Sequence, residues 1–301
     1  MSDSTGYRPL LFSIAYGMTG SVGDAEDIVQ DAFLGETKAR QAGTTITDRK
    51  AYLTTSVTRL GINYLRSARV KRETYVGNWL PEPVVVPADG PGPAEHAELS
   101  DSLSMAFLVL LEALSPVERA VFMLHEVFGY SHAETAAVVG KSEVNCRQIF
   151  ARARQRLAAG RPAPGPARRA ESDELARRFF DAVTGGDLDA LLGTLAPDVV
   201  SYGDGGGKAP ALATPLAGRE QVGLFLHQLF RRIAQAGGTL HPSLVNNRPG
   251  AVLHDAAGRV ISVLELDIAD GAVRTIHGVI NPDKLGHLGP LADLSRGLPR
   301  P

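Results

Sequence analysis

Apolar residues in the first 157 positions recur every three or four residues, which predicts a series of amphipathic helices. The first helix is expected from the apolar residues between Leu10 and Met18, and Gly17 and Gly20 are expected to end it. A second helix is expected over residues 24–40, opened by a capping-box pattern at Ser21. Its apolar side faces inward, and its outer side carries Asp24, Glu26, Asp27, Gln30 and Asp31.

A third helix is expected to begin after Asp48 and to run into a basic stretch near residue 72. Apolar residues between positions 51 and 65 form its buried side. Its polar side carries Arg59, Asn63, Arg66 and Arg69. Arg66, Arg69, Lys71 and Arg72 form a local basic cluster.

Residues 128–157 predict two short helices joined by a tight turn. The first begins at Ser131 and ends at Gly140, and Ser142 caps the second. One face of the second helix is apolar, and its other side carries Asn145, Arg147, Gln148, Arg152, Arg154 and Arg156. Such a helix is typical of one that reads the DNA major groove. An ordinary amphipathic helix with a solvated arginine face is the alternative, because helix-turn-helix patterns are short and degenerate.

Prolines and glycines mark two connecting stretches, at residues 78–100 and 160–170. We expect the prolines of the first stretch to exclude regular structure, and we expect Trp79 and Leu80 to dock in a pocket. Two helices are expected after it, over residues 95–114 and 115–128. The second stretch is predicted to be a flexible, basic linker.

The last third of the chain changes to an α+β pattern. Helices are expected over 171–183, 188–196 and 219–236, and strands over 199–204, 240–247, 250–255, 259–268 and 272–280. Turns are expected at 247–250, 255–258 and 270–271. Helices followed by a curved antiparallel sheet resemble the NTF2-like or SnoaL-like cone.

Composition narrows the functional classes. The formal net charge is -2, so nucleic-acid binding has to rest on the local basic clusters. Cys146 is the single cysteine, which excludes an intrachain disulfide and favours a buried apolar role in a reducing compartment. We find no signal or membrane-spanning pattern and expect a cytoplasmic protein. The eight histidines form no metal-binding spacing, so neither a metal nor another cofactor is expected.

Three stretches in order resemble the extracytoplasmic-function (ECF) sigma factors of bacterial RNA polymerase: DAEDIVQDAFL, AYLTTSVTRLGINYLRSARVKR and LSPVERAVFMLHEVFGYSHAETAAVVGKSEVNCRQIFARARQRL. The resemblance implies sigma region 2 in residues 1–77 and region 4 in residues 101–159. It implies that the acidic helix binds the beta-prime clamp of core RNA polymerase and that region 4 lies at the beta flap. The basic helix would melt and read the minus-ten promoter element, and region 4 would read the minus-thirty-five element.

Three short motifs resemble signatures of the SigJ-like subgroup, whose members carry a C-terminal SnoaL-like domain. The first is Trp79, Leu80, Pro81, Glu82 and Pro83. The second is Asp204, Gly205, Gly206, Gly207 and Lys208, and the third is Asn281, Pro282, Asp283, Lys284 and Leu285. The resemblance implies that a domain at 171–301 acts as a built-in regulator through these motifs, without a separate anti-sigma factor. The fold class is therefore multidomain, with two all-α sigma domains followed by an α+β cone.

Other functional classes remain open from the residues alone. Residues 204–208 do not match a phosphate-binding loop, because Tyr202 and Ala209 stand where that pattern needs Gly and Ser or Thr. The cone fold often hosts enzymes, but no spacing singles out a proton-transfer pair among Tyr202, Asp204, His241, Glu265, Asp267 and His277. A helix-turn-helix regulator with a sensing domain would leave the acidic helix without a purpose, and a cyclase or isomerase would explain only the last third. We therefore predict a non-catalytic sigma factor that binds core RNA polymerase and promoter DNA.

Overall fold

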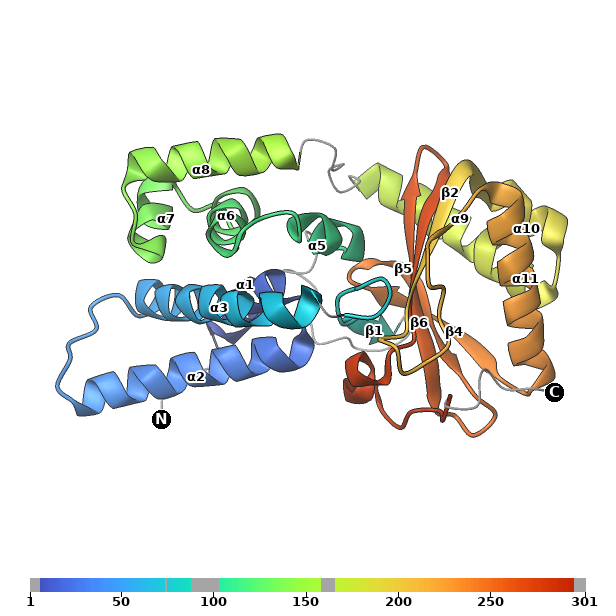
Figure 1. The fold of residues 1–301 in the computed structure, drawn as a ribbon, viewed down its shortest axis with the longest axis horizontal. Coiled ribbons are helices and arrows are strands. Elements are labelled where there is room, and N and C mark those ends of the chain that lie inside the picture. Colours follow the sequence, from blue (N-terminus) through green and yellow to red (C-terminus); the bar gives the residue numbers. More distant parts are fainter. Residues whose placement is uncertain (1–5, 74, 88–102, 158–165, 295–301) are drawn as a thin grey trace. The chain divides into compact units, whose positions relative to one another are not determined.

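The computed structural model describes residues 6–73, 75–87, 103–157 and 166–294. The chain forms two compact units that are interleaved in sequence (Figure 1). The first unit comprises Met1–Thr74 and Ala94–Arg161, and the second comprises Tyr75–Pro93 and Pro162–Pro301. The stretch after the third helix, expected to be a linker, therefore belongs with the C-terminal part of the chain.

The first unit begins with the three predicted helices: α1 (Arg8–Thr19), α2 (Val22–Gln41) and α3 (Arg49–Glu73). Gly20 ends α1 with a φ of 66°, a conformation that glycine adopts without strain. Gly17, which we expected to end this helix, lies inside it. The Ser21 hydroxyl caps α2 by accepting a hydrogen bond from the Asp24 backbone N–H at 3.1 Å.

The same unit continues with α5 (Met105–Leu111), α6 (Pro116–Phe122), the π-helical turn η1 (Met123–Val127), α7 (His132–Val139) and α8 (Glu143–Arg156). Ser115 and Ser131 both form capping boxes, with Glu118 and Glu134. Gly140, at a φ of 67°, makes the turn between α7 and α8. The predicted helix over 95–114 is helical from Met105 to Leu111, and residues 95–102 lie outside the described part of the chain.

The second unit is built on one seven-stranded sheet in the order β1-β4-β5-β6-β7-β2-β3. The strands are β1 (Val85–Pro87), β2 (Leu195–Asp204), β3 (Leu216–Ala217), β4 (Thr239–Val245), β5 (Arg248–His254), β6 (Val260–Ala269) and β7 (Ala272–Val279). The sheet is mixed rather than purely antiparallel, because β2 runs parallel to β7.

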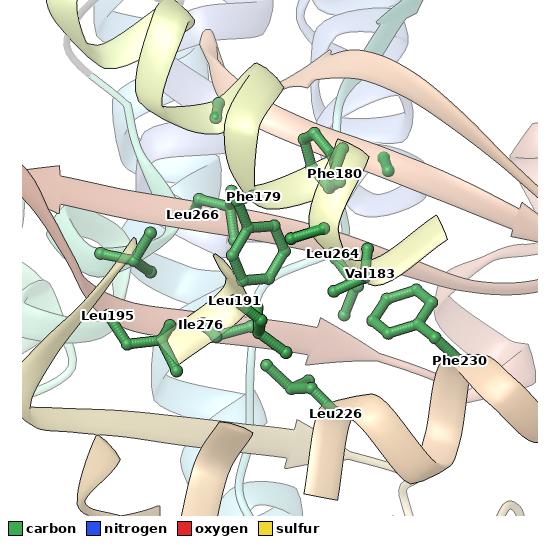
Figure 2. Packing of buried hydrophobic residues seen from close by; sticks show 14 of the residues in the cluster. Phe179, Phe180, Val183, Leu191, Leu195, Leu226, Phe230, Leu264, Leu266 and Ile276 are labelled. Carbon is green, nitrogen blue, oxygen red and sulfur yellow. The ribbon is translucent and has the colours of Figure 1, made fainter. Parts of the chain in front are cut away.

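Helices α9 (Pro166–Gly185), α10 (Leu188–Thr194) and α11 (Arg219–Gln235) cover one face of this sheet. Phe179 and Phe230 from the helices meet Leu264, Leu266 and Ile276 from the sheet in one buried core (Figure 2). Since side chains alternate along a strand, residues 263, 265 and 267 of β6 lie on the opposite face. Two short 3-10 turns follow β7, η2 (Pro282–Lys284) and η3 (Gly286–Leu288).

Three details differ from the sequence prediction. Residues 85–87 form a strand although prolines surround them, because β1 lies at the edge of the sheet, where a proline is tolerated. The hairpin after β4 turns at Asn246 and Asn247, with φ values of 49° and 59°, so that residues 248–250 already belong to β5. Helix α9 begins at Pro166, inside the expected linker, of which residues 160–165 lie outside the described part.

Within the described ranges, no helix combines the length and the apolar composition needed to cross a membrane.

Candidate DNA-binding faces and a regulatory latch

The polar side of α8 is exposed, as predicted, while its other side is buried in the first unit. Cys146, Ile149 and Ala153 are buried. Arg147, Gln148, Arg152, Arg154 and Arg156 are exposed, and Asn145 is half-buried. This face therefore presents amide groups near the N-terminus of α8 and guanidinium groups along the rest of it, as base and phosphate contacts require.

Two of these arginines are already paired within the protein. Arg147 forms an ion pair with Glu143, one turn earlier on α8. Arg156 pairs with Glu118 of α6 at 2.7 Å. Burial disfavours the charge of Glu118, but hydrogen bonds from Ser115 and the charge of Arg156 hold its pKa below the usual value. Arg156 thus ties α8 to α6.

The basic face of α3 is present over its described length. Arg59, Asn63 and Arg66 are exposed at spacings of four and three residues, which places them on one side of the helix. The side chains of Arg69, Lys71 and Arg72 lie outside the described residues.

The predicted acidic face of α2 divides into two groups. Asp27, Gln30 and Asp31 are exposed. Asp24 accepts a hydrogen bond from the Tyr64 hydroxyl of α3 at 2.7 Å, and Glu26 forms an ion pair with Arg8. Asp24 and Glu26 therefore have structural partners, whereas the other three side chains are directed to the solvent.

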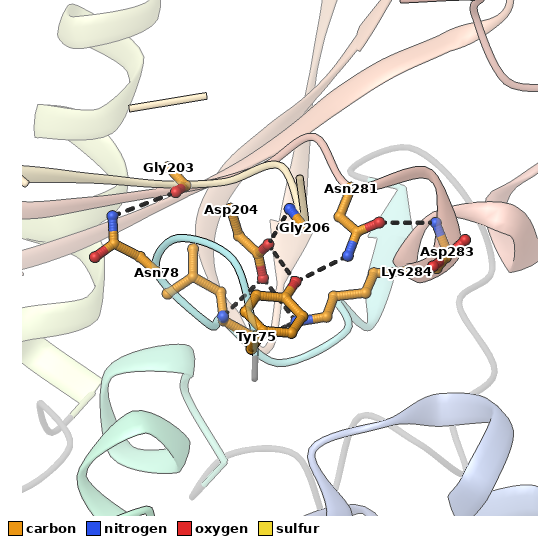
Figure 3. Close-up of polar contacts among 9 residues, drawn as sticks. Tyr75, Asn78, Gly203, Asp204, Gly206, Asn281, Asp283 and Lys284 are labelled. Atoms are coloured by element: carbon orange, nitrogen blue, oxygen red, sulfur yellow. Dashed lines mark hydrogen bonds and ion pairs between the residues drawn. The ribbon is translucent and has the colours of Figure 1, made fainter. Parts of the chain in front are cut away.

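The second unit binds the segment after α3 through one buried carboxylate, Asp204 at the end of β2 (Figure 3). Asp204 is 0% exposed. It accepts hydrogen bonds from the Tyr75 hydroxyl at 2.5 Å and from the Leu80 backbone N–H at 2.8 Å. It also pairs with the Lys284 ammonium at 2.6 Å. A buried carboxylate is stable only when it is paired in this way, so its partners are held firmly.

Lys284 reinforces this cluster from the loop after β7. Its ammonium group donates to the Leu80 carbonyl and lies 4.8 Å from the ring centre of Tyr75 and 4.6 Å from that of Trp79. These are cation–π distances. The Asn281 side chain donates to the Tyr75 hydroxyl at 2.8 Å, and burial together with Asp204 raises the pKa of Tyr75.

Further contacts continue along the segment. The Asn78 side chain donates to the Leu212 carbonyl at 3.2 Å. The ring of His287 lies 2.9 Å from the Pro83 carbonyl, and Asn246 exchanges hydrogen bonds with the Val84 backbone at 2.8 and 3.1 Å. Strand β1 then pairs with β4. We call residues 75–87, together with Asp204, Asn281 and Lys284, the latch.

Of the three motifs, the structure brings together Trp79 and Leu80 with Asp204, Asn281 and Lys284. Leu80 is 1% exposed, as expected for a docked side chain, and Trp79 is half-buried. Pro81, Pro83 and Leu285 are buried as well. Lys208 and Asp283 instead form an exposed pair with each other at 2.6 Å.

The glycines of the second motif are required by close packing. A Cβ atom at Gly205 would lie 2.2 Å from the Ala209 carbonyl oxygen, and one at Gly206 would lie 2.2 Å from the Asn281 side-chain nitrogen. Gly206 and Gly207 also have φ values of 57° and 72°. Residues 204–208 are therefore a structural turn, with the Lys208 N–H donating to the Gly205 carbonyl at 2.9 Å.

Sequence reasoning missed Tyr75, Asn78, Asn246 and His287. None of them belongs to a motif or a periodic pattern, and each is brought to the latch by contacts distant in sequence. It also missed a buried pair on the sheet face away from the helices, where His277 Nδ1 lies 2.6 Å from Glu265 Oε2. The two residues are cross-strand neighbours, which spacing along the chain does not reveal. No group of three or more His, Cys, Asp or Glu side chains suited to a metal ion occurs in the described ranges.

Comparison with known proteins identifies three segments. Family models match residues 5–70 (Sigma-70 region 2), 104–157 (Sigma-70, region 4) and 176–280 (SnoaL-like domain). The ECF RNA polymerase sigma factor SigJ of Mycobacterium tuberculosis is 38% identical over 296 residues, covering 94% of this chain and 92% of the relative. The probable ECF RNA polymerase sigma factor SigI of the same species is 31% identical over 288 residues, covering 94% and 93%.

A solved structure matches over nearly the whole chain. The crystal structure of M. tuberculosis SigJ aligns with a TM-score of 0.74 and 36% identity, covering 95% of this chain and 97% of that one. The multidomain fold expected from the sequence is confirmed, and with it the non-catalytic role that sigma factors have. The helices of the first unit, the SnoaL-like second unit and these relatives lead to one conclusion: the chain belongs to the ECF sigma factors of RNA polymerase.

Proposed function

We propose that this sigma factor reads a two-element promoter with its two basic helices. The polar face of α8 would read the minus-thirty-five element as duplex DNA, with Gln148 and Arg147 near the bases and Arg152 and Arg154 on phosphates. The exposed side of α3 would hold the minus-ten element, with Arg59, Asn63 and Arg66 facing the melted strand.

The acidic face of α2 is the proposed docking surface for the beta-prime clamp of core RNA polymerase. Asp27, Gln30 and Asp31 are the strongest candidates, because they are exposed and have no structural task in the described residues. Asp24 and Glu26 would contribute less, since Tyr64 and Arg8 already engage them. Region 4 is proposed to lie at the beta flap. Because the protein would bind RNA polymerase, we propose that it acts in the cytoplasm.

The SnoaL-like domain is proposed to regulate the sigma regions in cis by holding the segment that joins them. The supporting observation is the buried Asp204 carboxylate, whose partners Tyr75 and Leu80 both lie in that segment. A covalent tether gives such a contact an effective concentration near millimolar, so a modest interface is sufficient. Regulation of this kind needs no separate anti-sigma factor.

The test makes the same change, an aspartate to an asparagine, at two positions. Asp204→Asn keeps the shape of the buried side chain but removes the charge that pairs with Lys284, and the latch is expected to open. Trp79, the single tryptophan of the sequence, reports this directly as a red shift of its emission. Asp283→Asn changes the exposed pair with Lys208 and serves as the matched control.

With core polymerase and a cognate promoter, transcription by the Asp204→Asn variant is expected to rise severalfold, while that by the Asp283→Asn variant stays near the parent level. A red shift without any change in transcription would refute regulation in cis. An unshifted Trp79 spectrum in the Asp204→Asn variant would refute the latch itself.

A further inference from the structure

A small cavity lies in the second unit, at the edge of its apolar core. It has a volume of about 170 Å³ and is lined by eleven residues, of which nine have apolar side chains. The nine are Ala209, Val260, Ile261, Ile280, Pro282, Leu285, Leu291, Ala292 and Leu294. The other two, Lys208 and Asp293, are exposed, so the cavity opens to the solvent beside them.

Backbone hydrogen bonds hold one wall of the cavity in place. The segment after η3 pairs with the start of β6, where the Val260 N–H donates to the Pro290 carbonyl at 2.8 Å and the Ala292 N–H donates to the Val260 carbonyl at 2.9 Å. The space between the helices and the sheet is occupied instead by side chains such as Phe179 and Phe230 (Figure 2). The cavity is therefore a feature of the rim of the domain, where loops and the segment after η3 meet.

The loop after β7 forms part of both the cavity and the latch. Ile280 and Leu285 line the cavity. Asn281 and Lys284, which lie between them in the chain, belong to the latch (Figure 3). The Ile280 N–H also donates to the backbone carbonyl of Asp204 at 2.8 Å. A shift of this loop at the cavity therefore moves residues that hold the latch.

The lining of the cavity favours an uncharged, apolar ligand. A buried water molecule needs two to four polar partners, whereas a cavity of about 150 Å³ lined by aliphatic and aromatic side chains stays dry and binds benzene. At the mouth, Lys208 already pairs with Asp283 at 2.6 Å, and Asp293 carries the opposite charge. The mouth thus has no single sign of charge that would select an ionic ligand.

A ligand in this cavity is expected to favour the closed latch. The cavity exists in the conformation in which Asn281 and Lys284 hold the segment of residues 75–87. A ligand that needs this wall binds the closed state more tightly than the open one, so it raises the closed population. Opening of the latch must weaken the ligand by the same factor.

We propose that this cavity is a binding site for a small uncharged molecule built on one hydrocarbon ring, and that its binding keeps the latch closed. The ligand thereby holds the sigma factor in its resting state. This effect on transcription rests on the proposed regulation in cis, whereas the binding site itself does not.

Toluene is the probe, used with the full-length protein. Benzoate and benzylamine have the same ring but carry a negative and a positive charge at neutral pH. Calorimetric titration measures the three affinities. We expect toluene to bind at least tenfold more tightly than either charged molecule, because an ion would lose its hydration in the apolar cavity without gaining a partner. Equal or tighter binding of a charged molecule would overturn the ligand class.

Two variants fill the cavity from different segments. Ala292→Leu does so from the segment after η3, and Ala209→Leu from the turn after β2. Ala256→Leu makes the same change at an exposed position between β5 and β6 and is the matched control. We expect at least tenfold weaker toluene binding in a filled variant that melts at the parent temperature, and unchanged binding in the control. Unchanged binding in both filled variants would overturn the site.

Amide hydrogen exchange of residues 75–87 measures the effect on the latch. These amides exchange when the latch opens, so a ligand that binds only the closed state slows them by the factor 1 + [L]/Kd. With toluene at ten times its Kd we expect severalfold slower exchange, up to about tenfold. Exchange in α8 of the first unit should not change. Equal exchange of residues 75–87 with and without toluene would overturn the coupling.

Transcription separates this inference from the proposed function. With core polymerase and a cognate promoter, toluene should lower transcription by the parent severalfold and leave transcription by the filled variant unchanged. Reciprocally, Asp204→Asn should weaken toluene binding, and unchanged binding there would overturn the coupling. Slower exchange of residues 75–87 with unchanged transcription would count against regulation in cis alone, since the site and its coupling to the latch would both have been observed.

Discussion

At the scale of single residues, two neighbouring arginines of α8 have different environments. Arg154 is exposed and makes no ion pair within the described ranges, whereas Arg156 pairs with Glu118. We expect Arg154→Ala to weaken binding to all promoter sequences and to reduce the slope of log affinity against log salt by about 0.9. Binding titrations at several salt concentrations measure this slope.

Arg156→Ala is the comparison. This change should lower the free energy of unfolding by about 0.2–1 kcal/mol, because the ion pair with Glu118 is partly exposed. It should also reduce the salt slope less than Arg154→Ala does. Equal slopes for the two variants would show that Arg156 leaves Glu118 to bind a phosphate.

The residues of the latch show how much of this site the sequence alone could predict. Resemblance found Trp79, Asp204 and Lys284 because they lie in short motifs. Tyr75 was missed, although it donates to the same carboxylate, because its role depends on a contact with a residue far along the chain. Short motifs indicate candidate residues, whereas the partner of a buried charge is fixed only by the folded chain.

At the scale of elements, the helix-turn-helix contains a stacked histidine pair. The rings of His125 in η1 and His132 in α7 lie 4.0 Å apart, and both pack on Phe150 of α8. Burial, with His125 and Arg147, lowers the pKa of His132 against a smaller opposing effect of Glu143. The unfolded chain therefore takes up this proton first. The contribution of His132 to the stability of region 4 is fully present above about pH 6.5 and is lost as the pH falls from there through the lowered pKa of the folded chain.

We expect His132→Gln to reduce this loss of stability between pH 7.5 and 5.5. Exposure of the buried Cys146 to a thiol reagent that works in acid, followed during heating, measures it. His227→Gln in α11 is the control and should behave as the parent does. An equally large loss of stability in the His132→Gln and His227→Gln variants would show that His132 is not its cause.

Elements were predicted best where one periodic pattern determines them. The helices α1, α2, α3, α7 and α8 follow from apolar spacing and from caps that the sequence states directly. Strand β1 was missed because it consists of only three residues among prolines and depends on β4 for its hydrogen bonds. The mixed sheet was missed for a related reason, because the pairing of β2 with β7 joins strands distant in sequence.

At the scale of the whole molecule, the second unit is incomplete without residues 75–87. A fragment of residues 162–301 lacks β1 and two partners of Asp204, Tyr75 and Leu80. We expect a synthetic peptide of residues 75–87 to raise the melting temperature of this fragment, because binding to the folded state stabilises it. Calorimetric melting with increasing peptide measures the effect.

The same fragment with Asp204→Asn is the control, because it lacks the buried carboxylate and keeps strands β2 to β7 of the sheet. It should respond weakly to the peptide or not at all. An equal response of both fragments would mean that β1 pairing alone, without the buried carboxylate, holds the segment.

The pairing of residues 75–87 with the second unit also affects the length of free chain between α3 and α5. These residues and those up to Met105 form the leash between α3 and α5. The part from Tyr75 to Pro87 corresponds to roughly 45 Å of extended chain, and it cannot extend freely while the latch holds it. We therefore expect a closed latch to limit how far region 4 can move from region 2, and its release to lengthen the span that the two proposed DNA-binding helices can cover.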